Sequence, residues 1–84
     1  RNRQYSMRHV VVWSMDICPQ CAKAMTLLDT YSINYEVRKI GTEWSPDEFR
    51  LSVPNQTTVP QIVVNNELIG GYVDLINYLE NTGE

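Results

Sequence analysis

Hydrophobic residues recur along this chain with two periods, that of a strand and that of a helix. Three valines followed by a tryptophan predict a buried strand over residues 9–15, because branched and aromatic side chains favour extended backbone. A helix is predicted from Pro19 onward. Proline is tolerated at this first position, because the N–H group that it lacks would have no partner within the helix. Its apolar stripe consists of Cys21, Ala24, Met25, Leu28 and Tyr31.

The middle of the chain predicts a second strand and a short helix. Residues 34–40 alternate in polarity, which is typical of a strand with one mixed face. Strand, helix and strand in this order imply a right-handed parallel crossover. Residues 45–48 then have the pattern of a capping box, in which Ser45 caps a helix and Glu48 reaches back to the cap. This helix is expected to end near residues 53–54.

The last third predicts a hairpin and a final helix. Residues 59–64 form an apolar run that contains Pro60, which is acceptable only at the start or the edge of a strand. Two asparagines then favour a turn into a strand over residues 67–69. Gly70-Gly71 ends the hairpin, and a helix follows with the apolar stripe Tyr72, Leu75, Ile76 and Leu79. The whole order, β-α-β-α-β-β-α, predicts an α/β fold with a four-stranded mixed sheet flanked by three helices.

Size and charge narrow the class of protein. A chain of 84 residues forms one domain, and chains this short bury only about 60% of their unfolded surface, so a small two-layer core is expected. No apolar run approaches the roughly 20 residues of a membrane span. The net charge is -3, and three of the seven basic residues lie in the first eight positions. We therefore expect neither a membrane nor a nucleic acid as a partner.

The first eight residues show no periodicity. We predict a solvated N-terminal tail over residues 1–8, either native or an added remnant, and a folded domain over residues 9–84. The early apolar run is too short for a secretory signal, so the expected location is cytoplasmic.

Both cysteines of the chain lie in the motif Cys18-Pro19-Gln20-Cys21, between the first strand and the first helix. Two thiols at this spacing can meet across one turn of backbone and cycle between dithiol and disulfide. Two cysteines are too few for a secreted disulfide scaffold. A zinc site takes four ligands, and the chain offers only His9 besides the pair, so we predict redox chemistry and no metal site within one chain.

The two cysteines are expected to have different roles. The attacking species is a thiolate, and an unperturbed cysteine with a pKa of about 8.5 is mostly protonated at neutral pH. Cys18 precedes the helix, whose unpaired N–H groups favour an anion, whereas Cys21 lies one turn inside on the apolar stripe. We predict Cys18 as the nucleophile and Cys21 as the resolving thiol. Asp16 disfavours the thiolate unless it points to solvent or a base such as Lys23 approaches.

Two further motifs complete a known pattern. Thr58-Val59-Pro60 precedes the third strand, and Gly70-Gly71-Tyr72-Val73-Asp74 precedes the last helix. With these motifs, residues 10 to about 83 resemble a glutaredoxin, a minimal member of the thioredoxin-fold superfamily. The resemblance implies a thioredoxin-like fold with strand order 2-1-3-4, a third strand antiparallel to the first, and a cis peptide before Pro60.

The resemblance also implies glutathione as the reducing cosubstrate. A cis peptide would present the backbone of Val59 beside Cys18, where an extended peptide could pair with it. Amides at the start of the last helix would receive the γ-glutamyl carboxylate, and Asp74 would pair with the amine. Arg50 could reach the glycyl carboxylate, although an exposed structural arginine is the simpler expectation. The predicted binding residues are Gln20, Thr58, Val59, Pro60, Gly71, Tyr72, Val73 and Asp74.

Three positions depart from the common family pattern. Met15 stands where a basic residue is common, Gln20 where tyrosine is common, and Val73 where many relatives have a hydroxyl residue. Met15, Asp16 and Gln20 lie next to Cys18, so its reactivity is the property that the sequence leaves most open.

The implied activity is that of a glutathione-dependent oxidoreductase that reduces protein disulfides or glutathione mixed disulfides. The expected partners are disulfide-containing proteins, ribonucleotide reductase among them. The protein itself is expected to be a monomer. One alternative is a glutaredoxin-like redoxin reduced by thioredoxin reductase, which Gln20 would suit and Gly70-Gly71-Tyr72 disfavours. Another is a dimer that carries a glutathione-bridged 2Fe-2S cluster, which Pro19 makes less expected. A third, an interaction module with idle thiols, predicts that Cys18 is inert towards alkylation.

Overall fold

The computed structural model describes residues 9–82, so the tail predicted over residues 1–8 lies outside it. Strands and helices follow one another in the predicted order. Their bounds are β1 Val10–Ser14, α2 Pro19–Thr30, β2 Glu36–Lys39, α3 Pro46–Ser52, β3 Gln61–Val64, β4 Glu67–Gly70 and α4 Tyr72–Thr82. None of these helices combines the length and the apolar character that a membrane span requires.

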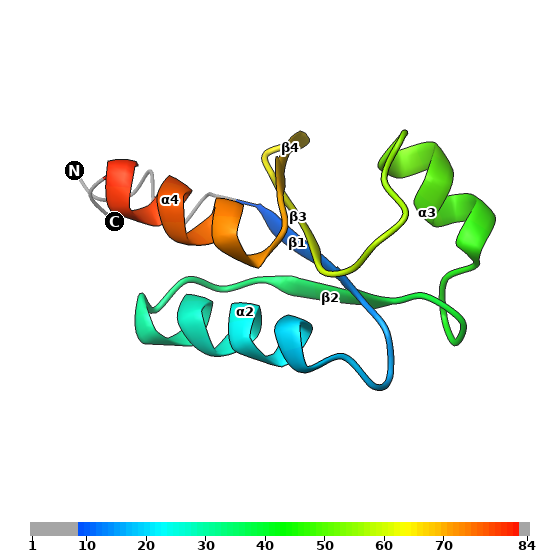
Figure 1. Cartoon of the computed structure of the whole chain (residues 1–84), viewed down its shortest axis with the longest axis horizontal. Coiled ribbons are helices and arrows are strands. Elements are labelled where there is room, and N and C mark those ends of the chain that lie inside the picture. The colour runs from blue at the N-terminus through cyan, green and yellow to red at the C-terminus, as the bar shows by residue number, and fades with distance from the viewer. Residues whose placement is uncertain (1–8, 83–84) are drawn as a thin grey trace.

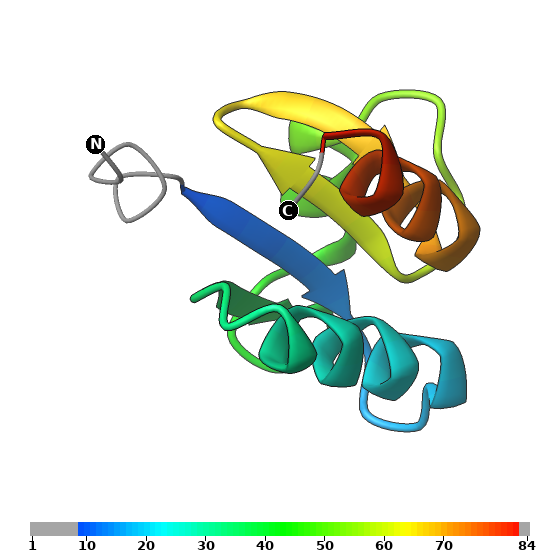
Figure 2. The same cartoon turned by 90° about the vertical axis from the view of Figure 1, so that its left-hand side faces the viewer.

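The four strands form one mixed sheet in the order β2-β1-β3-β4 (Figures 1 and 2). β1 pairs in parallel with β2 and antiparallel with β3, which in turn pairs antiparallel with β4. This confirms the predicted thioredoxin-like fold. Because β3 runs opposite to its neighbours, its start lies at the same edge of the sheet as the ends of β1 and β4. We call this edge, from which residues 15–18 leave β1, the cysteine edge.

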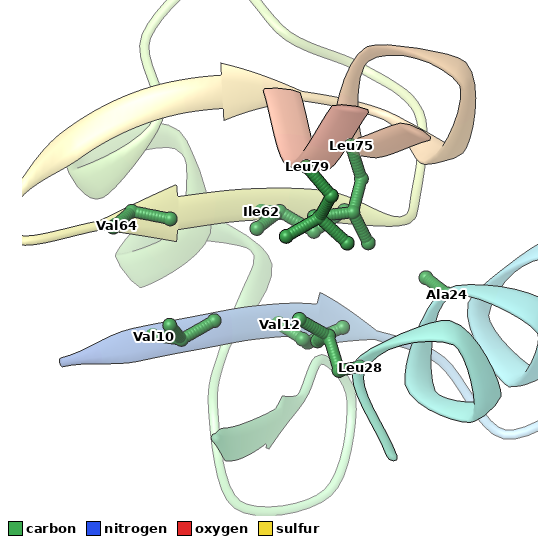
Figure 3. Packing of buried hydrophobic residues seen from close by; sticks show 8 residues of the cluster. All are labelled: Val10, Val12, Ala24, Leu28, Ile62, Val64, Leu75 and Leu79. Atoms are coloured by element: carbon green, nitrogen blue, oxygen red, sulfur yellow. The ribbon is translucent and has the colours of Figure 1, made fainter. Parts of the chain in front are cut away.

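The larger part of the core lies between the sheet and helices α2 and α4, which cover the same face (Figures 1 and 3). β1 and β3 contribute alternate residues, as a strand with one face on a core must. The buried members of this cluster are Val10, Val12, Ala24, Leu28, Ile62, Val64, Leu75 and Leu79. Both helices are therefore fixed against the sheet by their apolar stripes, and their first turns meet the cysteine edge.

Helix α3 covers the opposite face of the sheet (Figure 1). Trp13 is 1% exposed there and meets Trp44 and Phe49 edge to face, with ring centroids 5.3 and 5.4 Å apart. The guanidinium of Arg38 lies 4.4 Å from the centroid of the Trp44 ring. This aromatic cluster holds α3 and the segment before it against β1 and β2.

The start of α3 has the predicted capping box. The Ser45 hydroxyl accepts a hydrogen bond from the Glu48 N–H at 3.1 Å, and the Glu48 carboxylate accepts one from the Ser45 N–H at 2.7 Å. The strand predicted over residues 59–64 is shorter than expected, because β3 begins only at Gln61. Pro60 has no N–H to donate to a ladder, so regular pairing starts after it.

Candidate active site

Cys18 and Cys21 form a disulfide at the start of α2, with their Cα atoms 5.2 Å apart. This separation is ordinary for a disulfide, so one turn of helix brings the two sulfurs together without displacing backbone. Cys18 is the N-cap residue and has extended backbone, and the helix proper begins at Pro19. The predicted meeting of the two thiols across one turn is confirmed.

The two sulfurs differ in their surroundings. Cys21 is 1% exposed and packs in the interior, whereas Cys18 is only partly buried. The Cys21 N–H donates a hydrogen bond to the Cys18 Sγ at 3.2 Å, and the carbonyl of Cys18 accepts one from Ala22 at 3.1 Å. A backbone donor at a helix N-terminus is thus already directed at the Cys18 sulfur, where it would stabilise a thiolate.

The acid beside the motif is ion-paired. A carboxylate oxygen of Asp16 lies 3.2 Å from the Nζ of Lys39, and both side chains are largely exposed. Lys39 ends β2 and pairs with Ser14 of β1, so the sheet register brings it to the cysteine edge. Lys23, the base considered from the sequence, instead lines a cavity between α2 and α4 together with Tyr72. Sequence reasoning missed Lys39 because only strand pairing places it beside Asp16.

The second motif adopts the predicted backbone, since the peptide bond between Val59 and Pro60 is cis. A buried side chain supports this segment: the amide nitrogen of Gln61 donates to the carbonyl of Thr58 at 3.0 Å and approaches its hydroxyl at 3.3 Å. Gln61 is 3% exposed, and its amide oxygen has no hydrogen-bond partner among the described residues. Gln61 was not predicted as a site residue, although its polar side chain within an apolar run was a signal that could have identified it.

The third motif lies against the second. Gly71 lies beside Pro60: a Cβ added to the glycine would be in ordinary van der Waals contact with the Pro60 carbonyl oxygen, at 3.6 Å. The Gly71 N–H donates to the Asp74 carboxylate at 3.1 Å. Gly70 has a φ of +125°, and a Cβ there would collide with the same carboxylate. Asp74, predicted as a ligand for an amine, therefore also caps α4.

A groove of about 530 Å³ runs between the segment after β1, α3 and the second motif. It is lined mainly by apolar side chains, and Thr58, Val59 and Arg50 are among its residues. Arg50 is also ion-paired with Asp47 one turn earlier on α3. Arg50 is therefore an exposed, ion-paired residue that at the same time faces the groove.

The remaining predicted binding residues lie outside this groove. Tyr72 is half-buried, packs against the larger core and lines the cavity between α2 and α4. Gln20 is exposed in the first turn of α2, and Val73 is 66% exposed in the first turn of α4. The described residues contain no group of three or more histidine, cysteine or acidic side chains that could hold a metal ion.

A family model described as Glutaredoxin matches residues 10–69 of the chain. The chain is 34% identical over 76 residues to glutaredoxin 1 of Rickettsia prowazekii, and the match covers 88% of this chain and 79% of the relative. It belongs to the glutaredoxin family. Glutaredoxin 3 of Escherichia coli K12 is 30% identical over 69 residues, which cover 82% of this glutaredoxin and 83% of the relative.

Solved glutaredoxin structures share its fold. Reduced E. coli glutaredoxin superimposes with a TM-score of 0.76 at 26% identity, over 87% of this chain and 94% of that one. A buckwheat glutaredoxin, solved as a complex with glutathione, gives a TM-score of 0.69 at 21% identity, over 94% of this chain and 74% of that one. Family membership and the Cys18–Cys21 pair identify this glutaredoxin as a thiol-disulfide oxidoreductase.

Proposed function

We propose that this glutaredoxin reduces protein disulfides and glutathione mixed disulfides, and that glutathione returns it to the dithiol state. The observation that carries the proposal is the asymmetry of the pair. Cys18 is partly exposed at the start of α2 and receives a backbone N–H on its sulfur, whereas Cys21 is buried one turn inside. A substrate can therefore reach Cys18 first, while Cys21 is held within reach of it.

The exchange proceeds in two steps that conserve electrons. The Cys18 thiolate attacks one sulfur of the substrate disulfide, forms a mixed disulfide and releases the other substrate sulfur as a thiolate. The Cys21 thiolate then attacks the Cys18 sulfur, which closes the disulfide and releases the second substrate thiol. The substrate gains two electrons and the protein loses two. Two molecules of glutathione reverse the change and leave as glutathione disulfide.

The proposed glutathione site comprises the three motifs at the cysteine edge. The backbone of Val59 would pair with the tripeptide, and backbone amides at the start of α4 would receive its γ-glutamyl carboxylate. Arg50 lines the same groove as Thr58 and could meet the glycyl carboxylate. Buckwheat glutaredoxin, which has the same fold, forms a complex with glutathione.

Substrate and location follow from the same chemistry. We propose ribonucleotide reductase as one protein substrate, since its turnover consumes a dithiol donor. A glutathione-driven reductase works in a compartment that keeps thiols reduced, so we propose a cytoplasmic location. We also propose that the protein acts as a monomer, since one chain carries both Cys18 and Cys21.

The test is a comparison of reductants. We expect NADPH, glutathione reductase and glutathione to sustain turnover on a glutathionylated protein, and Cys18→Ser to abolish it. Cys21→Ser should retain reduction of the glutathione mixed disulfide and lose reduction of an intramolecular protein disulfide, because only the latter needs a resolving thiol. Turnover with NADPH and thioredoxin reductase alone would assign the protein to the redoxins driven by that enzyme instead.

A further inference from the structure

Gln61 is a buried polar residue in an otherwise apolar strand. Its side chain is 3% exposed, and within residues 9–82 Ser14 is the one other polar residue that is buried. The other residues of β3 are isoleucine and valine. A buried polar group destabilises the fold unless its hydrogen bonds are made, and the amide oxygen of Gln61 has no partner among the described residues. Stability alone therefore does not explain why this position holds a glutamine.

The register of the sheet places Gln61 opposite Trp13 on β1. Residues opposite each other in an antiparallel pair have their side chains on the same face, so Gln61 lies on the α3 side of the sheet, as Trp13 does. The groove described above lies on that side too, since Phe49 of α3 lines it. The amide nitrogen of Gln61 lies 3.0 Å from the carbonyl oxygen of Thr58 and 3.4 Å from the Oε1 of Gln56, and both of these residues line the groove. Gln61 thus supports one wall of the groove from the protein interior.

The contact with the Thr58 carbonyl sets the direction of one peptide group. The peptide bond between Thr58 and Val59 is trans, because the one cis bond among the described residues precedes Pro60. In a planar trans peptide the C=O and N–H groups point in opposite directions. Since the carbonyl of Thr58 points to the buried Gln61, the N–H of Val59 points away from it. Val59 lines the groove, and its N–H has no hydrogen-bond partner among residues 9–82.

We propose that Gln61 is a positioning residue, which holds this peptide group so that the Val59 N–H is offered to the backbone of glutathione. The inference rests on the glutathione site proposed above. Without the amide donor of Gln61, the Thr58 carbonyl is free to turn towards water, and the Val59 N–H turns with it. The hydrogen bonds of Gln61 involve neither cysteine, so Gln61 acts on the affinity for glutathione and not on the reactivity of Cys18.

The experiment removes the donor and retains the size of the side chain. Gln61→Met has a side chain of similar length that donates no hydrogen bond. The probe is S-methylglutathione, whose capped sulfur does not exchange with thiols, and it is titrated into the reduced, isotopically labelled protein. Nuclear magnetic resonance gives both the dissociation constant and the shift of the Val59 amide proton. We expect the variant to bind the probe about fivefold more weakly, with a smaller downfield shift of this proton, because one neutral hydrogen bond is lost.

A second measurement separates positioning from general damage to the site. Alkylation of reduced Cys18 by iodoacetamide depends on its thiolate and not on the groove, so Gln61→Met should keep the wild-type rate. Val63→Ala is the matched control, because Val63 lies on the same strand and the same face as Gln61 but does not line the groove. This control should lower the midpoint of urea denaturation and retain the affinity for S-methylglutathione.

Other outcomes would overturn the proposal. Equal affinities of the wild type and Gln61→Met would mean that the Val59 peptide group keeps its direction without Gln61, while glutathione use stands. A loss of affinity together with slower alkylation, or an equal loss in Val63→Ala, would attribute the effect to a damaged fold. A wild-type protein that does not bind S-methylglutathione would reject both this proposal and the glutathione site on which it rests.

Discussion

The negative charge beside the reactive cysteine is balanced by a lysine from strand β2. Asp16 lies two positions before Cys18, and Lys39 at the end of β2 forms an ion pair with it. Position 15 holds a methionine and not a base. The ion pair with Lys39 is therefore the contact that offsets the repulsion between the Asp16 carboxylate and a Cys18 thiolate. Both side chains are exposed, so the effect is modest and sensitive to salt.

We predict opposite effects from the two halves of this pair. Lys39→Gln leaves the Asp16 carboxylate unbalanced and should slow alkylation of reduced Cys18 at pH 7 about twofold to threefold, which is the size expected of an exposed pair. Asp16→Asn should accelerate it, because Lys39 then favours the thiolate. The rate is measured by mass spectrometry with iodoacetamide at low ionic strength. The double variant should return to the wild-type rate, and effects that persist unchanged in 1 M salt would contradict the electrostatic origin.

At the scale of elements, the edge strand β2 pairs with β1 through its ladder and also contacts His9, the residue before β1, through the Glu36 side chain. Arg38 donates to the Glu36 carboxylate at 2.7 Å, and His9, before β1, lies 3.3 Å from the same carboxylate. The hydrogen bond from Arg38 lowers the pKa of Glu36, His9 acts in the same direction, and partial burial opposes them. Ionised Glu36 therefore stabilises the folded state more than the unfolded one.

This contact predicts a stability difference that depends on pH. Since the pKa of Glu36 is lower in the folded state than its ordinary value of 4.5, its contribution is full above that value and is lost as the pH falls through the folded pKa. The Glu36 side chain is 43% exposed, so Glu36→Gln should cost only about 0.5 kcal/mol at pH 7. The cost should shrink progressively as the pH is lowered below 4.5. Urea denaturation at pH 7 and at a series of lower pH values measures it.

Glu67 provides the matched control for this prediction. Glu67→Gln makes the same change of charge on β4, the opposite edge strand, where Glu67 is exposed and forms no ion pair with the described residues. Its effect on the free energy of unfolding should be smaller at pH 7. An equal loss in both variants would attribute the effect to net charge and not to the contact with Arg38.

The elements were predictable from sequence because each has a local signal. Runs of valine mark β1 and β3, and the capping box at Ser45 marks the start of α3. The ends of elements were less predictable: β3 begins after Pro60 because proline cannot join the ladder, and Ile40 and Trp44 form a bridge outside any strand. Local patterns do not specify where regular pairing stops.

From the residue pattern alone, without the family resemblance, the site was predictable where one turn of helix forms its contacts. One turn of helix brings Cys18 to Cys21, so their spacing was sufficient. The partners of Asp16 and Thr58 were not foreseen. Lys39 reaches Asp16 through the register of two parallel strands, so that contact depends on the pairing of the sheet and not on any one motif. Gln61 reaches Thr58 over only three residues, but the contact depends on the backbone geometry around the cis peptide before Pro60, which the polar pattern does not specify.

At the scale of the whole molecule, the two faces of the sheet share β1. Val10 and Val12 point into the core under α2 and α4, whereas Val11 and Trp13 point into the cluster under α3. Because β1 is buried on both faces and belongs to both clusters, separating β1 from one cluster also disrupts the other. The disulfide at the start of α2 is therefore supported by a fold that should unfold as one unit.

Leu75→Ala tests this coupling. Leu75 is 0% exposed on the core-facing side of α4, so removal of its side chain should cost about 2 to 5 kcal/mol, a large share of the stability of a domain this size. Trp13 lies on the opposite face and reports on the other cluster. In urea denaturation of the variant, the midpoints measured by tryptophan fluorescence and by far-ultraviolet circular dichroism should fall to the same lower value.

Leu51→Ala, at an exposed position of α3, is the control and should leave the midpoint nearly unchanged. A fluorescence midpoint that stays at the wild-type value while the dichroism midpoint falls would mean that the two faces unfold separately.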